Sequence, residues 1–184
     1  NHFVASVEDY QKTATIEGVS PLVWRSGMKH DCTKIMELEK LNDHFKNKLN
    51  VKVKLEPDLV YGILKSSDLK GSTNRDCRKY TIVTQKKIGQ DTNYIEEQYP
   101  LTYQYLQDNQ RHFHQRKSSI YNNKPRFSIF GIGDYSFAKY KVAISGLYKT
   151  TRFTLVQPLT GKPLMLDDTC YFIGFDSKIF AKIA

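Results

Sequence analysis

The stretch of the chain most suggestive of chemistry runs from residue 110 to residue 121, Gln-Arg-His-Phe-His-Gln-Arg-Lys-Ser-Ser-Ile-Tyr. It places Arg116 and Lys117 beside the hydroxyl of Ser118, at the expected end of a helix. Guanidinium groups match the geometry of phosphate oxygens or of a guanine edge, and short hydroxyl side chains donate to phosphate. Cations at a helix C-terminus can also serve only to stabilise the helix dipole. We favour the phosphate-binding interpretation.

A second stretch, residues 125–141, interleaves aromatic and basic side chains around a Gly-Ile-Gly-Asp turn. Arg126, Tyr135, Lys139 and Lys141 are of the types that stack on bases or neutralise phosphates. Lys139 and Lys141 are two residues apart in an expected strand and should therefore share one face. The glycines do not form a dinucleotide-binding fingerprint, because the third glycine and the following helix are missing. For the phenylalanines of this stretch, core packing is the better interpretation.

Two shorter motifs also combine cations with groups that bind anions. Lys29 lies in a glycine turn, residues 24–31, just before an expected helix whose first N–H groups attract anions. Lys65 and Ser66 belong to the run Leu-Lys-Ser-Ser-Asp-Leu at 64–69, which could hold a phosphate or simply cap and turn the chain.

Catalytic patterns are weak. The run His-Asp-Cys at 30–32 is consecutive, so its side chains diverge and cannot all bind one metal ion. Asp134, Asp167 and Asp168 could serve a metal-dependent nuclease, although turn formation is the commoner role of adjacent aspartates. The 184 residues contain no Gly-x-Ser-x-Gly, no phosphate-binding loop and no Asn-Pro-Pro-aromatic motif. We therefore predict no catalytic and no metal-binding residue.

The composition indicates one folded, basic domain. Lys and Arg number 28 against 19 Asp and Glu, a formal net charge of +9, and 40% of the residues are hydrophobic and 12% aromatic. These fractions exclude a disordered chain, and no apolar run approaches the roughly 20 residues of a membrane helix. A chain this basic is attracted to polyanions through counterion release, although charge alone does not single out nucleic acid.

The cysteines and the N-terminus bear on compartment and origin. Cys32, Cys77 and Cys170 are far apart and odd in number, which argues against a disulfide framework or a zinc knuckle and suits a reducing cytoplasm. The first residues show neither an initiator Met nor a signal-peptide pattern. We expect a fragment of a longer protein, in which residues 1–22 connect to a domain at 23–184.

Expected helices lie early in the chain and expected strands mostly late. Apolar spacing predicts helices from Ile35 to Leu49, over residues 57–64, and from Pro100 to about Arg116. Runs of β-branched and aromatic residues predict strands at 51–55, 79–84, 127–130, 140–144, 153–156 and 171–175. This distribution favours an α+β domain with a mixed or antiparallel sheet over a regularly alternating parallel sheet.

Several blocks of the chain, in a fixed order, carry a family resemblance. They are Val23–Cys32, Leu64–Asp68, Pro100 with Tyr105-Leu106, Arg116–Tyr121, Phe130–Phe137 with Tyr140-Lys141-Val142, and Asp167-Asp168-Thr169. Together they resemble the C-terminal target recognition region of bacterial N6-adenine DNA methyltransferases, which include the γ-class type II enzymes and the fused restriction-modification enzymes. The resemblance extends from about Val23 to Phe175.

The resemblance implies a division of labour. A separate methylase domain of the same chain would bind S-adenosylmethionine and carry the Asn-Pro-Pro-aromatic motif, and the recognition region would read double-stranded DNA and help to extrude the adenine. No cofactor is then expected in this chain, which should not methylate DNA alone. Base extrusion needs a duplex that is gripped on both sides of the target.

The residues expected to contact DNA are drawn from the motifs above. They are Lys29, Lys65, Ser66, Arg116, Lys117, Ser118, Arg126, Tyr135, Lys139 and Lys141. Further candidates for reading purine edges are Gln85, Asn122, Asn123 and Gln157. Two alternatives stay open: a metal-dependent nuclease domain of a fused restriction enzyme, and a specificity subunit that docks a separate methylase.

Overall fold

The computed structural model describes residues 6–147 and 151–184. Within these residues the strands form two mixed sheets with several helices, which confirms the α+β class. The five-stranded sheet has the order β1 (Arg25–Ser26), β11 (Cys170–Phe175), β8 (Tyr140–Ser145), β9 (Thr154–Val156) and β6 (Thr73–Asn74). The six-stranded sheet has the order β10 (Met165–Leu166), β5 (Val60–Leu64), β7 (Lys79–Ile82), β2 (Glu37–Lys40), β3 (Phe45–Asn47) and β4 (Lys52–Val53).

Both sheets are mostly antiparallel. The parallel pairs are β10 with β5 and β6 with β9. The chain therefore crosses between the sheets several times: β5 and β7 belong to the six-stranded sheet, whereas the short β6 between them joins the other sheet. Segments distant in sequence are placed side by side by this topology.

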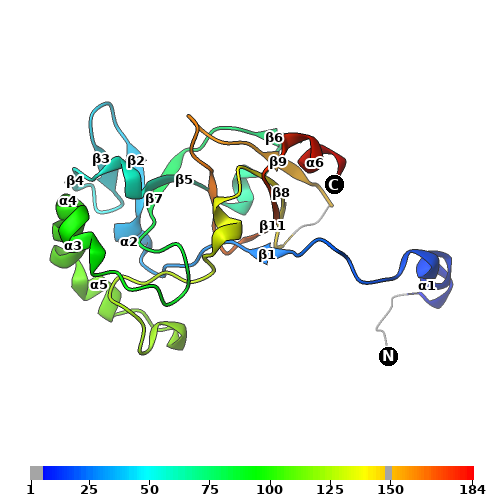
Figure 1. Cartoon of the computed structure of the whole chain (residues 1–184), viewed down its shortest axis with the longest axis horizontal. Helices are drawn as coiled ribbons and strands as arrows, with labels where there is room; N and C mark the ends of the chain where they lie inside the picture. The colour runs from blue at the N-terminus through cyan, green and yellow to red at the C-terminus, as the bar shows by residue number, and fades with distance from the viewer. Residues whose placement is uncertain (1–5, 148–150) are drawn as a thin grey trace.

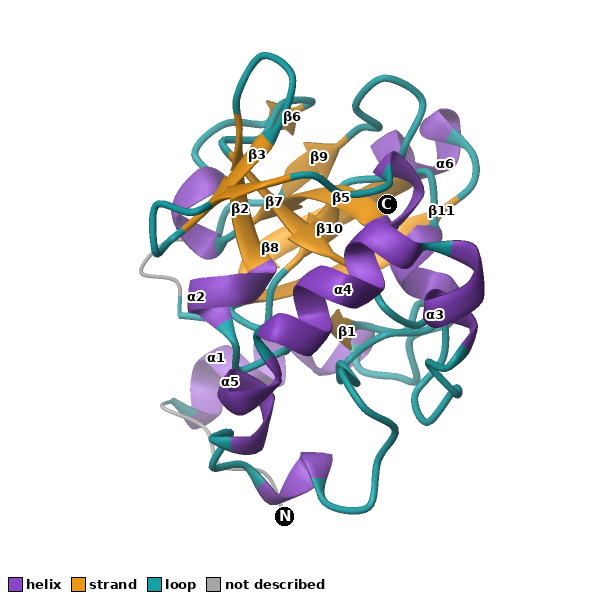
Figure 2. Ribbon diagram, turned by 90° about the vertical axis from the view of Figure 1, so that its left-hand side faces the viewer, coloured by secondary structure: helices purple, strands orange, loops and turns teal. Residues whose placement is uncertain are grey.

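Helices cover one side of the six-stranded sheet. Figure 2 shows α4 (Pro100–Asp108) lying across the strands, with α3 (Tyr94–Gln98) and α5 (Gln110–His114) near its ends. The larger apolar cluster fills this layer and includes Leu38 and Ile82 from the sheet and Leu106 and Phe113 from the helices. The hydroxyl of Tyr105 donates to the carbonyl of Ile35 at 2.9 Å. That bond ties α4 to α2 (Thr33–Met36).

The remaining helical segments are short. They are α1 (Val7–Thr13), α6 (Lys178–Ile183) and the 3-10 turns η1 (Ala14–Ile16), η2 (Pro57–Leu59), η3 (Ser66–Asp68), η4 (Ser119–Tyr121) and η5 (Asp134–Phe137). Helix α1 buries no residue, and Figure 1 shows it at the end of an extended segment that leads away from the sheets. Among the described residues, no helix is long and apolar enough to cross a membrane.

The helix predicted from Ile35 to Leu49 is wrong. After the single turn of α2 the chain forms β2 and β3, because Glu37–Lys40 pairs with β7 on one side and with β3 on the other. Leu41 and Leu49, which completed the helical spacing, are exposed. Pairing with distant strands outweighs a local helical pattern.

The helix predicted over residues 57–64 is also wrong beyond its first turn, because Val60–Leu64 forms β5 between two partner strands. Gly62 is required there by packing: a Cβ atom would lie 2.5 Å from the Sγ atom of Cys77 and 2.6 Å from a methyl carbon of Leu164.

The other predictions are largely confirmed. The helix from Pro100 to about Arg116 is present as α4 and α5, divided at Asn109. Strands at 79–84, 140–144, 153–156 and 171–175 correspond to β7, β8, β9 and β11, and β4 lies within 51–55. The strand predicted at 127–130 is wrong: Phe127 has a φ of 59°, and only Phe130 forms a bridge, with Lys29.

Lys141 lies in the core rather than on the surface. Strand β8 begins at Tyr140, so Lys139 stands outside it and remains exposed, whereas Lys141 is only 1% exposed. The prediction that the two lysines share one face is therefore wrong. The Lys141 ammonium donates to the carbonyls of Ala138 at 2.8 Å and Leu164 at 2.9 Å. Burial lowers the pKa of Lys141 to about 7.

We predict that Lys141 makes stability rise above neutral pH. Its pKa in the folded state lies below the ordinary lysine value, so between pH 7 and 10 the unfolded chain binds more protons than the folded one, and the free energy of unfolding increases with pH. In Lys141→Met, the free energy of unfolding should increase between pH 7 and 10 by at least about 1 kcal/mol less than in wild type, since one pKa unit corresponds to about 1.4 kcal/mol. Urea unfolding of both proteins at several pH values measures the effect. Parallel curves would contradict it.

Candidate nucleic-acid interface

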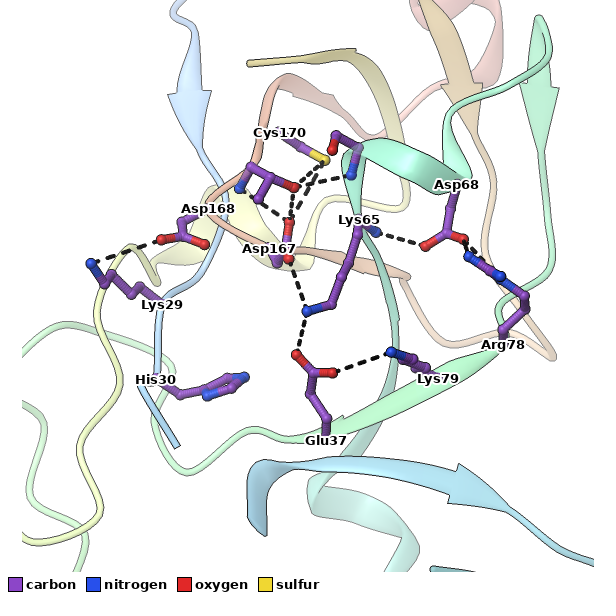
Figure 3. A network of polar contacts seen from close by, with 12 residues as sticks. Lys29, His30, Glu37, Lys65, Asp68, Arg78, Lys79, Asp167, Asp168 and Cys170 are labelled. Atoms are coloured by element: carbon purple, nitrogen blue, oxygen red, sulfur yellow. Dashed lines mark hydrogen bonds and ion pairs between the residues drawn. The ribbon is translucent and has the colours of Figure 1, made fainter. Parts of the chain in front are cut away.

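The basic motif at 64–69 contributes Lys65 to an ion-pair cluster around a buried carboxylate, the Glu37 network, formed by Glu37, Lys48, Lys65, Lys79 and Asp167. Figure 3 shows the carboxylate of Glu37 facing Lys65 and Lys79. Glu37 is only 2% exposed, and its oxygens lie 2.8 Å from the ammonium of Lys48 and 3.6 Å from that of Lys79. Lys65 donates to Glu37 and lies 3.4 Å from Asp167. The network joins β2 and β7 to the residues that directly follow β3, β5 and β10.

The electrostatics of this network favour charged partners. Burial by itself would raise the pKa of Glu37, but hydrogen bonds from Lys48 and Lys65 hold that pKa below its ordinary value. Burial opposes the charge of Lys65 as well, yet the hydrogen bond to Glu37 raises the pKa of Lys65. The charges of Glu37 and Lys65 therefore depend on each other, and the network holds neighbouring strands together.

The neighbouring motif residues complete the same connection. Ser66 donates its backbone N–H to the hydroxyl of Thr169 at 3.0 Å, and Thr169 donates to Asp167. Asp68 accepts the Lys65 backbone N–H at 2.9 Å and pairs with Arg78. Lys65 and Ser66, which we predicted to contact DNA, are thus engaged within the protein, Lys65 through its ammonium and Ser66 through its backbone N–H. We leave both out of the proposed contact set.

Lys29 lies at the edge of this cluster. Its ammonium is 3.7 Å from Asp31 and 3.9 Å from Asp168, and its side chain stays 38% exposed. His30, which follows it, is buried: its Nδ1 atom accepts the N–H of Cys32 at 3.1 Å, and burial lowers the pKa of His30 to about 4. Of these two neighbours, Lys29 stays open to a ligand and His30 does not.

The three carboxylates of the nuclease alternative do not converge. Asp167 belongs to the Glu37 network, Asp168 faces Lys29, and Asp134 lies 4.0 Å from Lys87. In the part of the chain that the structure describes, no three His, Cys, Asp or Glu side chains are grouped closely enough to hold a metal ion.

The main basic motif surrounds a surface cavity of about 250 Å³, which we call the 110–126 hollow. It is lined by Gln110, Phe113, His114, Arg116, Tyr121, Asn122, Lys124, Pro125, Arg126 and Phe127. Lys124 and Arg126 are exposed at its rim, as is the adjacent Lys117. Arg126 contacts Gln107 and Gln110 and lies 5.0 Å from the ring of Phe127. The hollow therefore combines cations, amides and aromatic rings.

Arg116 forms a wall of the hollow. Its guanidinium donates to the carbonyls of Phe113 at 3.1 Å and Ser128 at 2.6 Å, and to that of His30 at 3.4 Å. It also stacks 3.7 Å above the ring of Tyr121. These contacts use most of its donors, so we assign Arg116 a positioning role instead of the phosphate contact that we expected. Ser118 is half-buried, and its hydroxyl has no hydrogen-bonding partner in residues 6–147 and 151–184.

The remaining candidates lie outside the hollow. Tyr135 is half-buried and packs between Arg25, at 5.0 Å, and the ring of Phe172. Lys139 is exposed beside Tyr140. Gln85 and Gln157 are buried, whereas Asn122 and Asn123 are exposed. Of the side chains that could read bases, the structure therefore gathers Asn122, Asn123 and Arg126.

Our reasoning from the sequence missed where the charge is concentrated. Residues 109–166 hold ten of the 28 Lys and Arg but only one of the 19 Asp and Glu, Asp134, so this segment carries the entire formal excess of nine positive charges. The rest of the chain is balanced. A count of charges along the chain would have shown this.

A different loop, residues 85–93, is hydrogen-bonded to the segment at 126–129. Gln85 accepts the N–H of Ile129 at 2.9 Å, and Thr92 donates to the carbonyl of Arg126 at 2.5 Å. These bonds hold residues 85–93 against the segment that follows the hollow. The exposed Lys86 and Lys87 lie at the start of this loop.

The chain is similar to a characterised protein. Over 162 residues it is 44% identical to the type II methyltransferase M.NspV of Nostoc sp. (strain ATCC 29411 / PCC 7524), a match that covers 88% of this chain and 34% of the relative. The chain thus spans about a third of the length of the curated relative that it matches, and it is related to a part of a methyltransferase. No protein-family model matches it.

The methyl donor of such enzymes does not fit the hollow described here. S-adenosylmethionine carries a positive sulfonium centre, and Arg116, Lys124 and Arg126 line the hollow with no carboxylate among its lining residues. The Asn-Pro-Pro-aromatic motif is also absent from the sequence. We assign no cofactor site to this surface.

We predict that Glu37→Gln destabilises the protein by about 2 kcal/mol, because it removes the buried carboxylate that three lysines share, and those lysines are partly open to water. The pKa of Glu37 is lowered in the folded state, so this contribution is present above its ordinary pKa and disappears as the pH falls below it. Denaturant unfolding at pH 7 and pH 3 measures the difference.

Glu39→Gln is the matched control. Glu39 lies on the same strand, is 58% exposed and pairs only with Lys46 at 3.3 Å. An exposed pair contributes about 0–1 kcal/mol, so this variant should unfold almost like wild type. Equal effects of the two substitutions would refute a structural role for the network.

Proposed function

We propose that this chain is the target recognition domain of an S-adenosylmethionine-dependent adenine-N6 DNA methyltransferase of a restriction-modification system, and that it binds double-stranded DNA in a sequence-specific manner. The 44% identity with part of a type II methyltransferase carries the proposal. A part that lacks the Asn-Pro-Pro-aromatic motif leaves methyl transfer to another domain of the same protein. Residues 1–22 would connect to that domain, and the reducing cytoplasm is the expected compartment.

The charge distribution supports DNA as the ligand. Binding to a duplex is driven by release of counterions when lysines and arginines neutralise phosphates. The acid-poor segment 109–166 concentrates these cations, and the 110–126 hollow presents Lys117, Lys124 and Arg126 together. Lys86 and Lys87 are exposed on the loop that is hydrogen-bonded to Arg126 and Ile129, and they add two further cations there.

Different residues serve different parts of recognition in this proposal. Lys117, Ser118 and Lys124 bind phosphates, which positions the duplex without reading its sequence. Arg126, Asn122 and Asn123 lie near base edges, since arginine pairs with guanine and asparagine with adenine. Lys29, Tyr135 and Lys139 remain proposed contacts at the periphery, where a long duplex can reach them.

We predict that Lys124→Ala weakens binding to every duplex and makes the slope of log affinity against log salt shallower by about one unit, because one phosphate contact is lost. Fluorescence anisotropy with a labelled duplex at 50–300 mM salt measures both quantities. Lys54→Ala is the control. Lys54 is also exposed, but it directly follows β4 and does not line the hollow. A wild-type slope in Lys124→Ala would remove this residue from the interface.

Arg126→Ala should behave differently. If its guanidinium reads a base edge, the substitution costs about 1–3 kcal/mol at one base pair and relaxes the preference there. Selection of bound duplexes from a random library, with wild type and variant in parallel, tests this. Identical selected sites for both proteins would show that Arg126 reads no base, and the absence of any selected site for wild type would contradict sequence-specific binding.

A further inference from the structure

A second cavity, of about 400 Å³, has residues of loop 85–93 in its lining. We call it the tyrosine pocket, because Tyr61, Tyr94, Tyr99 and Phe137 line it together with Gln98 and Lys86. Residues 83–90 contribute one wall, and Gln85 in that wall accepts the N–H of Ile129 beyond it. Thr92 of the same loop donates to the carbonyl of Arg126, a lining residue of the 110–126 hollow, so this loop links the two cavities.

The aromatic rings of the pocket are arranged edge to face. Tyr61 meets Phe137 at 5.8 Å between ring centroids, and Tyr94 meets Tyr99 at 6.1 Å. All four side chains are half-buried. Rings that are only partly covered by one another leave faces and edges for a further flat ring.

Polar groups of the pocket divide into those that are engaged and those that are free. The hydroxyl of Tyr94 donates to the carbonyl of Thr84 at 3.0 Å. The ammonium of Lys162 donates to the carbonyls of Pro57, Asp58 and Val60. It also lies 4.1 Å from the centre of the Tyr61 ring, so Lys162 is engaged with the protein and forms part of the pocket wall.

Other polar groups have no protein partner. In the described part of the chain, no hydrogen bond engages the hydroxyls of Tyr61 and Tyr99 or the side-chain amide of Gln98, and no carboxylate pairs with Lys86. The carboxylate of Asp58 lies at the rim and is exposed. The pocket thus offers donors and acceptors around aromatic surface, with a cation at one side.

We propose that the tyrosine pocket binds an unpaired nucleobase of DNA that is held at the 110–126 hollow. A base is a flat ring with hydrogen-bonding groups at its edge, and base–aromatic stacking tolerates any base. Asp58 disfavours a phosphate inside the pocket, so the backbone stays outside it, on the side where Lys86 lines the pocket. This inference rests on the proposed function, because it takes the ligand to be part of a bound duplex.

The test compares two duplexes of identical sequence, one fully paired and one with a single bulged adenine, by fluorescence anisotropy. Wild type should bind the bulged duplex at least fivefold more tightly, which corresponds to the lower end of the stacking contribution. Tyr99→Leu should lose this preference while its affinity for the paired duplex changes less than twofold. The double variant Tyr61→Phe with Tyr99→Phe keeps the rings and should reduce the preference in part.

Tyr80→Leu is the matched control. Tyr80 is also half-buried, but it lies on β7 against Phe45 and does not line the pocket. This variant should keep the preference for the bulged duplex. Thermal melting of all variants checks that they are folded.

The outcomes separate this inference from the proposed function. Equal wild-type affinity for both duplexes, or a preference that survives both pocket substitutions, overturns the pocket. Binding of the bulged duplex alone supports the pocket and contradicts recognition of paired DNA, and binding of neither contradicts both. Competition by free adenosine monophosphate without any preference for the bulge would assign the pocket to a free nucleotide and overturn the proposal.

Discussion

The buried carboxylate of Glu37 is the constraint on which the arrangement of this molecule depends. It lies on a central strand, and lysines from three other parts of the chain must approach it, because an unpaired charge at such a depth is strongly unfavourable. Lys65 links it onward to Asp167, and the backbone beside Asp167 bonds to Met28. The segment that follows β1 is thereby fixed against the end of β5. A charged network of this kind favours one strand register in the six-stranded sheet, since a shift by one residue would separate the partners.

The sequence predicted those parts of the structure in which local preference and tertiary environment agree. The helix from Pro100 was predictable because proline marks its start, and because Tyr105 and Leu106, which were expected on its apolar face, are buried. Residues 35–49 show the opposite situation: their spacing fits a helix, but β2 is held by hydrogen bonds to β7, about forty residues away. Likewise Lys65 and Glu37 are 28 residues apart, and nothing local indicates that they meet.

The candidate site was predictable in its location and only partly in its members. The segment around Arg116 was identified because cations, amides and hydroxyls are adjacent there in the sequence. Arg116 and Lys141 turn inward because they donate to backbone carbonyls. Those carbonyls come close only in the folded chain, so the sequence alone does not show which cations face solvent. Exposed neighbours such as Lys124 acquire their importance only once the inward-facing cations are known.

Arg116 secures its surroundings through main-chain oxygen atoms of Phe113, Ser128 and His30, which every amino acid possesses. The rim of the hollow is therefore anchored independently of the side chains that it displays. Substitutions at Asn122, Asn123 or Arg126 can exchange the displayed groups without loosening the anchor. Such a surface can diverge rapidly among descendants of one ancestor, each acquiring its own preference while the supporting framework is inherited unchanged.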